Sequence, residues 1–269
     1  MNYFPRFYKT CNCKASECKD TCCKDWNIYL DNKSKDMLEC FNRKYPNLAS
    51  NSIIEKDGIS YINFHNGVCP FLNTNKMCEI QRRGGIEYLC YSCREYPRKQ
   101  IQIGNDTKYT LSLSCEKSVS LVLKHMSLEE LIIPNTSNKL ILLQNEIIKK
   151  VISNDVQLLS QNEKNSIINC FSKMDITDSA LKNRIVNIAL EQNGLKNDEI
   201  KKLTGFYIWS LFDGNNLNDV KHISAFMINL YSVFLSGSPD NYSEKEYLIH
   251  KLSKEIEHCD KNLELIREC

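Results

Sequence analysis

The chain of 269 residues carries 35 Lys+Arg against 33 Asp+Glu, a formal net charge of +2, and 42% of its residues are hydrophobic. These values are typical of a globular protein with one large domain or two smaller ones, and they exclude a disordered chain. The charge is too evenly balanced to indicate nucleic-acid binding. No apolar run reaches the roughly 18 residues of a membrane span, and the N-terminus lacks the apolar stretch of a signal peptide. We therefore expect a cytoplasmic protein with neither nucleic-acid nor membrane partners.

Cysteine usage divides the chain into two parts. All but three of the 14 cysteines lie in residues 1–115. This part is irregular, with a short strand expected at residues 61–64 and a β-hairpin at 99–114 that turns at Gly104-Asn105-Asp106. The sequence thus predicts a small, irregular, cysteine-rich α+β metal-binding domain over residues 1–120.

Helical patterns dominate the remainder. Ser127 and Glu130 have the spacing of a capping box, which marks the start of a helix. Apolar residues recur at helical spacing in residues 138–152, 180–192, 219–235 and 242–266. The last of these segments is expected to be one long helix with a polar face. We predict a helical domain over residues 121–269 and a fold that is mainly α.

The cysteine spacings of the first part indicate a bound metal. Cys13-x4-Cys18-x3-Cys22-Cys23 is followed by Cys69-x8-Cys78. Thiolates at short spacing suit zinc or an iron–sulfur cluster, and a reducing cytoplasm disfavours a disulfide framework. Zinc sites commonly pair two C-x2-C units, and Cys90-x2-Cys93 is the only such unit here. The irregular spacing therefore favours a cluster, while zinc stays open.

The remaining cysteines have a simpler interpretation. Isolated cysteines most often behave as small buried hydrophobic residues, which is the expectation for Cys40, Cys170 and Cys259. Cys269, the last residue, and Cys11 are expected to have no specific role.

Four segments, in their order along the chain, resemble the flagellin lysine N-methylase family and the broader group of cysteine-cluster proteins thought to chelate zinc or iron. The segments are CKASECKDTCCKDWNIYLD (13–31), GVCPFLNTNKMC (67–78), EIQRRGGIEYLCYSCREYPR (79–98) and LSLSCEKS (111–118). The resemblance covers about residues 3–120. The helical remainder does not match the family segment by segment.

The resemblance implies an enzyme that methylates lysine side chains of flagellin, or of another protein, with S-adenosylmethionine. It also implies an iron–sulfur cluster, most simply of the 4Fe–4S type. The family pattern falls on Cys13, Cys18, Cys22, Cys23, Cys69, Cys78, Cys93 and Cys115 as metal ligands, and it leaves out Cys11 and Cys90. The alternative is a non-catalytic iron–sulfur or zinc protein with a redox or interaction role.

The usual signatures of methyl transfer are missing from the sequence. None of the nine glycines forms the G-x-G turn of a Rossmann-type donor site. A radical mechanism would require C-x3-C-x2-C, and Asp25 stands where the third cysteine should follow Cys18 and Cys22. The location of the donor site therefore stays open.

The segment CREYPR holds the best candidates for catalysis outside the cysteines. We expect Arg94 and Arg98 to pair with a carboxylate, and Tyr96 to orient or deprotonate the lysine amine. The alternative is that Tyr96 packs beside the metal and that both arginines are solvated.

Overall fold

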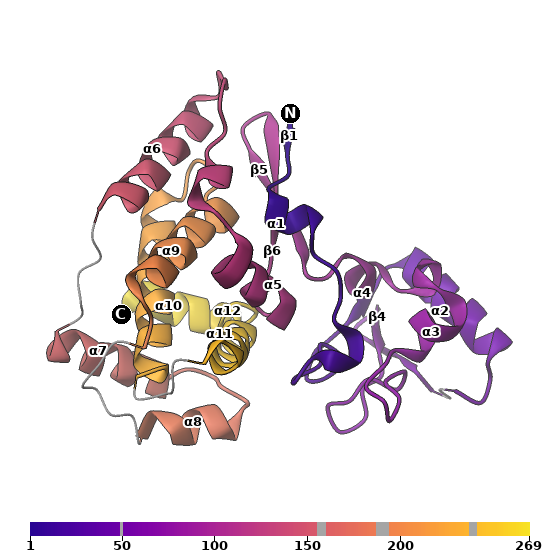
Figure 1. Ribbon diagram of the computed structural model, residues 1–269. Helices are drawn as coiled ribbons and strands as arrows, with labels where there is room; N and C mark the ends of the chain where they lie inside the picture. The colour runs from indigo at the N-terminus through magenta and orange to yellow at the C-terminus, as the bar shows by residue number, and fades with distance from the viewer. Residues whose placement is uncertain (49–50, 155–159, 187–193, 237–240) are drawn as a thin grey trace. The chain divides into compact units, whose positions relative to one another are not determined.

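The computed structural model describes residues 1–48, 51–154, 160–186, 194–236 and 241–269. The chain forms two compact units (Figure 1). Unit 1 joins residues 1–11 to residues 97–269, and unit 2 consists of residues 12–96. These boundaries differ from the expected division at residue 120, because the hairpin after Pro97 packs with the helices. The mainly helical fold, with two small sheets, is as expected.

Unit 1 contains a three-stranded sheet in the order β1-β6-β5. Strands β5 (Arg98–Ile103) and β6 (Asp106–Leu111) form the predicted hairpin, and β1 (Asn2–Tyr3) pairs with β6 in parallel. Gly104 has a φ of +60°, which suits a residue without a Cβ at this tight turn. The first residues of the chain thus belong to the same body as its second half.

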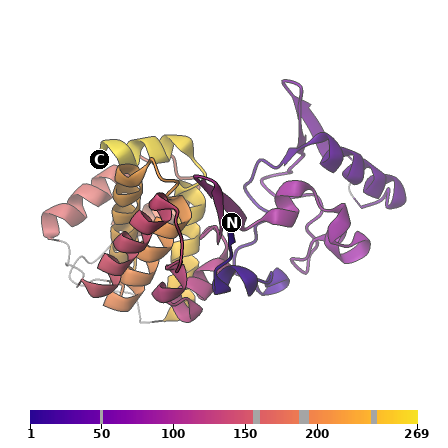
Figure 2. The ribbon, with the colours of Figure 1, turned by 90° about the horizontal axis from the view of Figure 1, so that it is seen from above.

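The helices of unit 1 pack against one another around a single core (Figure 2). They are α1 (Arg6–Lys9), α5 (Glu116–Ser120), α6 (Lys139–Ser153), α7 (Gln161–Ser172), α8 (Ser179–Val186), α9 (Asn197–Leu211), α10 (Leu217–Phe234), α11 (Tyr242–Ile256) and α12 (Asp260–Glu268). A π-helical turn (Leu121–His125) and a 3-10 turn (Leu128–Leu131) follow α5, and the predicted Ser127–Glu130 capping box begins the 3-10 turn.

The predicted helices at 138–152 and 219–235 are confirmed as α6 and α10. The prediction for 180–192 is met by α8 up to Val186, and its residues 187–192 lie outside the described residues. None of the helices in the described ranges is both long and apolar enough to cross a membrane.

The prediction of one long final helix over 242–266 is wrong. The segment breaks between α11 and α12, where Glu257 accepts a hydrogen bond from Tyr207 Oη at 2.5 Å. Next to it, His258 Nε2 lies 2.9 Å from Ser114 Oγ. Helix α11 is also largely buried, including His250 and Lys245, so it has no broad polar face turned to water.

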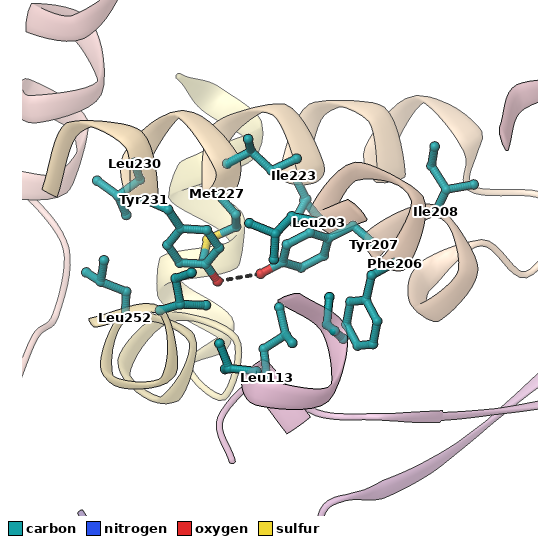
Figure 3. Packing of buried hydrophobic residues seen from close by; sticks show 14 of the residues in the cluster. Leu113, Leu203, Phe206, Tyr207, Ile208, Ile223, Met227, Leu230, Tyr231 and Leu252 are labelled. Carbon is teal, nitrogen blue, oxygen red and sulfur yellow. Dashed lines mark hydrogen bonds between the residues drawn. The ribbon is translucent and has the colours of Figure 1, made fainter. Parts of the chain in front are cut away.

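Helices α9 and α10 form the centre of the core (Figure 3). Tyr207 and Tyr231, one from each helix, are fully buried, and their hydroxyl groups lie 2.6 Å apart. Each phenol therefore finds a polar partner inside the core, as buried tyrosines require, and Tyr207 also donates to Glu257.

Unit 2 is smaller and richer in loops. Strands β2 (Tyr29–Leu30), β4 (Ile59–Ile62) and β3 (Ile53–Lys56) form an antiparallel sheet in that order. Its helices are α2 (Asn32–Lys44), α3 (Glu79–Gly84) and α4 (Tyr91–Glu95), with 3-10 turns at Ala15–Glu17 and Ile86–Tyr88. The core gathers around Phe41 of α2, which is fully buried and touches the rings of Phe71 and Tyr88.

Candidate metal centre

Two cysteine-bearing segments of unit 2 are joined by their backbones. Asp25 N–H donates to Gly67 O at 2.7 Å, and Cys69 N–H donates to Cys23 O at 2.9 Å. This short antiparallel pairing places Cys23 beside Cys69, although 45 residues lie between them in the sequence. Cys69 is buried in the apolar core of unit 2.

Cys78 follows a tight loop that its own side chains hold. Asn73 Oδ1 accepts from the N–H groups of Asn75 at 2.9 Å and of Met77 at 3.0 Å. Glu79, next to Cys78, accepts from Asn73, Arg82 and Arg83, and these hydrogen bonds hold the pKa of its carboxyl at about 2. The loop therefore presents Cys78 in a defined position.

Cys90 and Cys93 lie at the start of α4. Cys90 is its N-cap residue, and Ser34 of α2 fixes this point by accepting from Tyr91 N–H at 2.9 Å. The Cys93 thiol donates a hydrogen bond to Cys90, which lowers the pKa of Cys90 and raises that of Cys93. Residues three apart at a helix start share a face, so the C-x2-C spacing brings the two sulfurs together.

Five thiols of unit 2 lie close enough to act on each other's charge, and we call them the thiol cluster: Cys23, Cys69, Cys78, Cys90 and Cys93. The pKa of the Cys69 thiol is raised to about 12, mainly by burial and in smaller part by the neighbouring sulfurs of Cys23, Cys78 and Cys90. Neighbouring thiolates repel one another, and a bound thiophilic cation would remove that cost because thiolates are its natural ligands.

The described residues contain no group of three or more His, Cys, Asp or Glu side chains arranged to hold a metal ion. The thiol cluster is thus a set of neighbouring sulfurs and not an assembled ligand shell. Its chemistry fits a thiophilic metal or an iron–sulfur cluster. The metal itself stays a prediction.

The predicted ligands divide between the two units. Cys23, Cys69, Cys78 and Cys93 belong to the thiol cluster. Cys13, Cys18 and Cys22 lie in the loop before β2, and Cys13 Sγ accepts from Ala15 N–H at 3.2 Å. Cys115 is in unit 1, where it is the N-cap residue of α5.

Cys90 is the thiol that the family pattern left out and the structure adds. It is buried, it accepts the Cys93 hydrogen bond, and it acts on both Cys69 and Cys78. The C-x2-C spacing of Cys90 and Cys93 is the feature of the sequence that could have identified Cys90 as a member of the cluster.

The three predicted catalytic side chains also lie in different units. Tyr96 ends α4 in unit 2 and meets Trp26 edge-on, with ring centroids 5.9 Å apart. Arg94 donates to Glu95 at 3.3 Å. Arg98 begins β5 in unit 1, donates to Cys11 O at 2.8 Å and lies over the Tyr8 ring. Arg98 therefore already has a structural task, and the catalytic roles of all three residues stay predictions.

Two cysteines of unit 1 are bonded to each other. Cys170 of α7 and Cys269, just after α12, form a disulfide with a sequence separation of 99. The predictions that Cys170 is an isolated thiol and that Cys269 has no role are therefore wrong. Their distance in sequence hid the pairing, which only the packing of α7 and α12 on α10 reveals.

Curated relatives share part of the chain. A lysine-N-methylase of Salmonella typhimurium is 30% identical over 126 residues, which are 44% of this chain and 31% of that protein. A lysine-N-methylase of Salmonella choleraesuis matches to the same extent. The flagellar biosynthetic protein FliU of Salmonella muenchen is 29% identical over 126 residues, covering 75% of its length.

Over 44% of its length the chain is similar to lysine N-methylases. The match spans about a third of the length of the two curated lysine-N-methylases. No protein-family profile matches the chain, and no solved structure is similar to it. These relatives confirm the expected resemblance.

Proposed function

We propose that this chain is an S-adenosylmethionine-dependent protein-lysine N-methyltransferase that acts on flagellin and contains a cysteine-bound iron–sulfur cluster. The proposal is supported by the relationship to lysine N-methylases together with the thiol cluster of unit 2. Five neighbouring thiols within about 70 residues (23–93) form a donor set suited to iron and sulfide.

The residues of unit 2 would hold the cluster. Cys69 and Cys90 come from the core, Cys78 from the loop that Asn73 and Glu79 hold, and Cys93 from the first turn of α4. Bound there, an iron–sulfur cluster supplies either electron transfer or an open iron site. Because the ligands come from separate loops, the free energy of cluster binding would add to the folding stability of unit 2.

The methyl donor would bind at a site unlike the Rossmann type. The sheets of the described residues have three strands each, and neither is a doubly wound parallel sheet. S-adenosylmethionine would supply an electrophilic methyl group. Tyr96 would accept or relay the proton that the lysine amine must lose before it attacks.

A second candidate function is a non-catalytic redox or metal carrier. The observation in its favour is the hydrogen-bonded Cys90–Cys93 pair at a helix start, an arrangement that redox dithiols also use. Such a protein would bind the metal without binding a methyl donor.

The deciding experiment is anaerobic purification with iron, sulfide and zinc analysis, followed by calorimetry with S-adenosylmethionine. Flagellin is then incubated with protein and donor, and its lysines are examined by mass spectrometry. Added methyl mass on flagellin lysines supports the enzyme. An iron-loaded protein that neither binds the donor nor methylates flagellin would establish the carrier instead.

A further inference from the structure

The α7–α8 link, residues Lys173–Asp178, is fastened to the C-terminal helices at successive positions. Asn262 of α12 accepts from Asp175 N–H at 2.7 Å and donates to Asp175 O at 2.9 Å. Thr177 donates its N–H to Glu255 of α11 at 2.6 Å. Each bond crosses from the link to a helix about 80 residues later in the chain.

The end of the link and the start of α8 line one side of a surface depression in unit 1. Asp178, Leu181 and Arg184 line it from the link and α8, and Tyr247, Leu248 and Lys251 line it from α11. Lys251 Nζ and Asp178 Oδ2 form an ion pair at 2.7 Å, with side chains 10% and 18% exposed. The last residue of the link is therefore part of the lining of this depression.

The Cys170–Cys269 disulfide lies directly beside this link. Cys170 precedes the link by three residues and is buried, whereas Cys269 is exposed after the last turn of α12. The bond therefore ties the start of the link to α12, the helix whose Asn262 holds Asp175. A sequence separation of 99 means that this bond closes a long loop, for which cross-linking stabilises most.

We propose that the Cys170–Cys269 disulfide is a reversible redox clip that controls the order of the α7–α8 link and so of the depression between α8 and α11. The inference does not depend on the proposed methyltransferase function. The other 12 cysteines, all of them among the described residues, are outside any disulfide, so this pair is the one disulfide in the described part of the chain.

The exchange chemistry is a two-electron reaction with a dithiol. A thiolate of the dithiol attacks the exposed Cys269 sulfur, the S–S bond breaks, and the Cys170 thiolate leaves and takes up a proton. The second thiol of the dithiol then displaces Cys269, which leaves as a thiol while the dithiol becomes its own cyclic disulfide. Reoxidation runs the same steps backwards with the oxidised dithiol as electron acceptor.

Reduction should loosen the link without releasing α12. Ile266 stays fully buried, and His222 Nε2 lies 2.6 Å from Ile266 O, so α12 keeps contacts to α10 that do not involve sulfur. The clip is thus expected to tune local order and leave the fold intact.

The test compares the oxidised and reduced full-length protein. Proteolysis under non-reducing conditions should give one peptide pair that joins Cys170 to Cys269, lost after treatment with reduced dithiothreitol. Hydrogen exchange, read by mass spectrometry, should be roughly tenfold faster or more at residues 174–182 in the reduced form. The melting temperature should fall by roughly 5 °C or more.

Variants separate the clip from general effects of reductant. Cys269→Ser, at an exposed position, should match the reduced protein in exchange and lose its response to dithiothreitol. Cys259→Ser, a cysteine outside any disulfide in the same region, should behave as wild type. Equal exchange at residues 174–182 in oxidised and reduced wild type, or absence of the linked peptide after oxidation, would overturn the proposal.

Discussion

The ammonium group of Lys108 lies 2.7 Å from the backbone carbonyl oxygen of Phe212, inside unit 1. Lys108 is on β6 and is fully buried. It also donates to Trp209 O at 2.9 Å and to the side-chain oxygen of Gln144. The Lys108 ammonium group therefore donates hydrogen bonds to two carbonyl groups at the end of α9 and to a side chain of α6. These bonds connect the sheet to the helices.

We expect Lys108→Met to destabilise unit 1 by about 2–4 kcal/mol at pH 7, because three buried acceptors lose their donor. Removal of the buried charge offsets only part of this loss. The measurement is urea unfolding followed by tyrosine and tryptophan fluorescence. Lys149→Met, an exposed lysine on α6, is the matched control and should change stability little. Equal stability of the two variants would show that the three hydrogen bonds are not needed.

The same lysine predicts a dependence of stability on pH. Burial lowers the pKa of Lys108 to about 7, below its value of 10.5 in an unfolded chain. Between these two values the unfolded state binds more protons, so the folded state gains stability as pH rises from about 7 to 10.5. The free energy of unfolding of wild type, relative to Lys108→Met, should therefore increase over this window. A difference that stays constant with pH would mean that the amine keeps its proton throughout.

Glu79 predicts a second pH dependence of the same sign, at acid pH, in unit 2. Its hydrogen bonds from Arg82, Arg83 and Asn73 hold its pKa at about 2, below the ordinary 4.5. Its contribution to stability is present above pH 4.5 and is lost as the pH falls toward 2. Glu79→Gln should remove this acid-sensitive part and disorder the loop before Cys78, as read by acid titration of the circular dichroism. Glu87→Gln, an exposed control in the same unit, should titrate as wild type does.

The thiol cluster predicts that Cys90 matters for metal binding as much as Cys69 does. Each contributes a buried sulfur, so replacement of either by serine should lower iron content strongly and loosen unit 2. Cys40→Ser, an exposed cysteine on α2, should keep full metal content. The measurement is iron and sulfide per chain after anaerobic reconstitution. Full iron content in a variant with both Cys69 and Cys90 replaced by serine would show that the thiol cluster is not the iron site.

Tyr96→Phe tests the proposed catalytic role. Loss of the phenol should slow methyl transfer to flagellin by about 10²-fold or more, the usual scale for one acid–base group, and leave the iron content unchanged. Tyr91→Phe, an exposed tyrosine of the same helix, is the control. An unchanged rate in Tyr96→Phe would keep the enzyme and assign this side chain only to packing against Trp26.

Local pattern predicted much of the fold. The hairpin at Gly104, the α6 and α10 helices and the Ser127 capping box all depend on contacts between near neighbours, which sequence spacing records. The break before Asp260 was missed because its cause is distant: Tyr207 binds Glu257 from 50 positions earlier in the chain, and Ser114 binds His258 from 144 positions earlier. The Cys170–Cys269 bond escaped prediction for the same reason.

The sequence predicted that the candidate site consists of cysteines, but it identified only some of the residues that form it. Spacing identified the cysteine-rich region, and the family resemblance named four members of the thiol cluster: Cys23, Cys69, Cys78 and Cys93. Cys90 was left out because the family pattern omitted it, although the C-x2-C spacing was visible. Which cysteines become neighbours depends on the pairing of residues 23–25 with 67–69, and no local signal encodes that register.

The parallel pairing of Asn2 with Thr107 has a consequence for how the chain folds during synthesis. The ribosome releases β1 first, yet its partner strand emerges only about 100 residues later, after the whole of residues 12–96. Unit 2 can therefore fold before the second half of unit 1 has been synthesised. Because Arg98 donates a hydrogen bond to Cys11 O, the chain leaves unit 1 and returns to it at neighbouring positions. Unit 2 is therefore an insertion in the sequence of unit 1. Replacing residues 12–96 by a short glycine-rich bridge should then leave the larger body able to fold, whereas a cut at residue 120 would divide it.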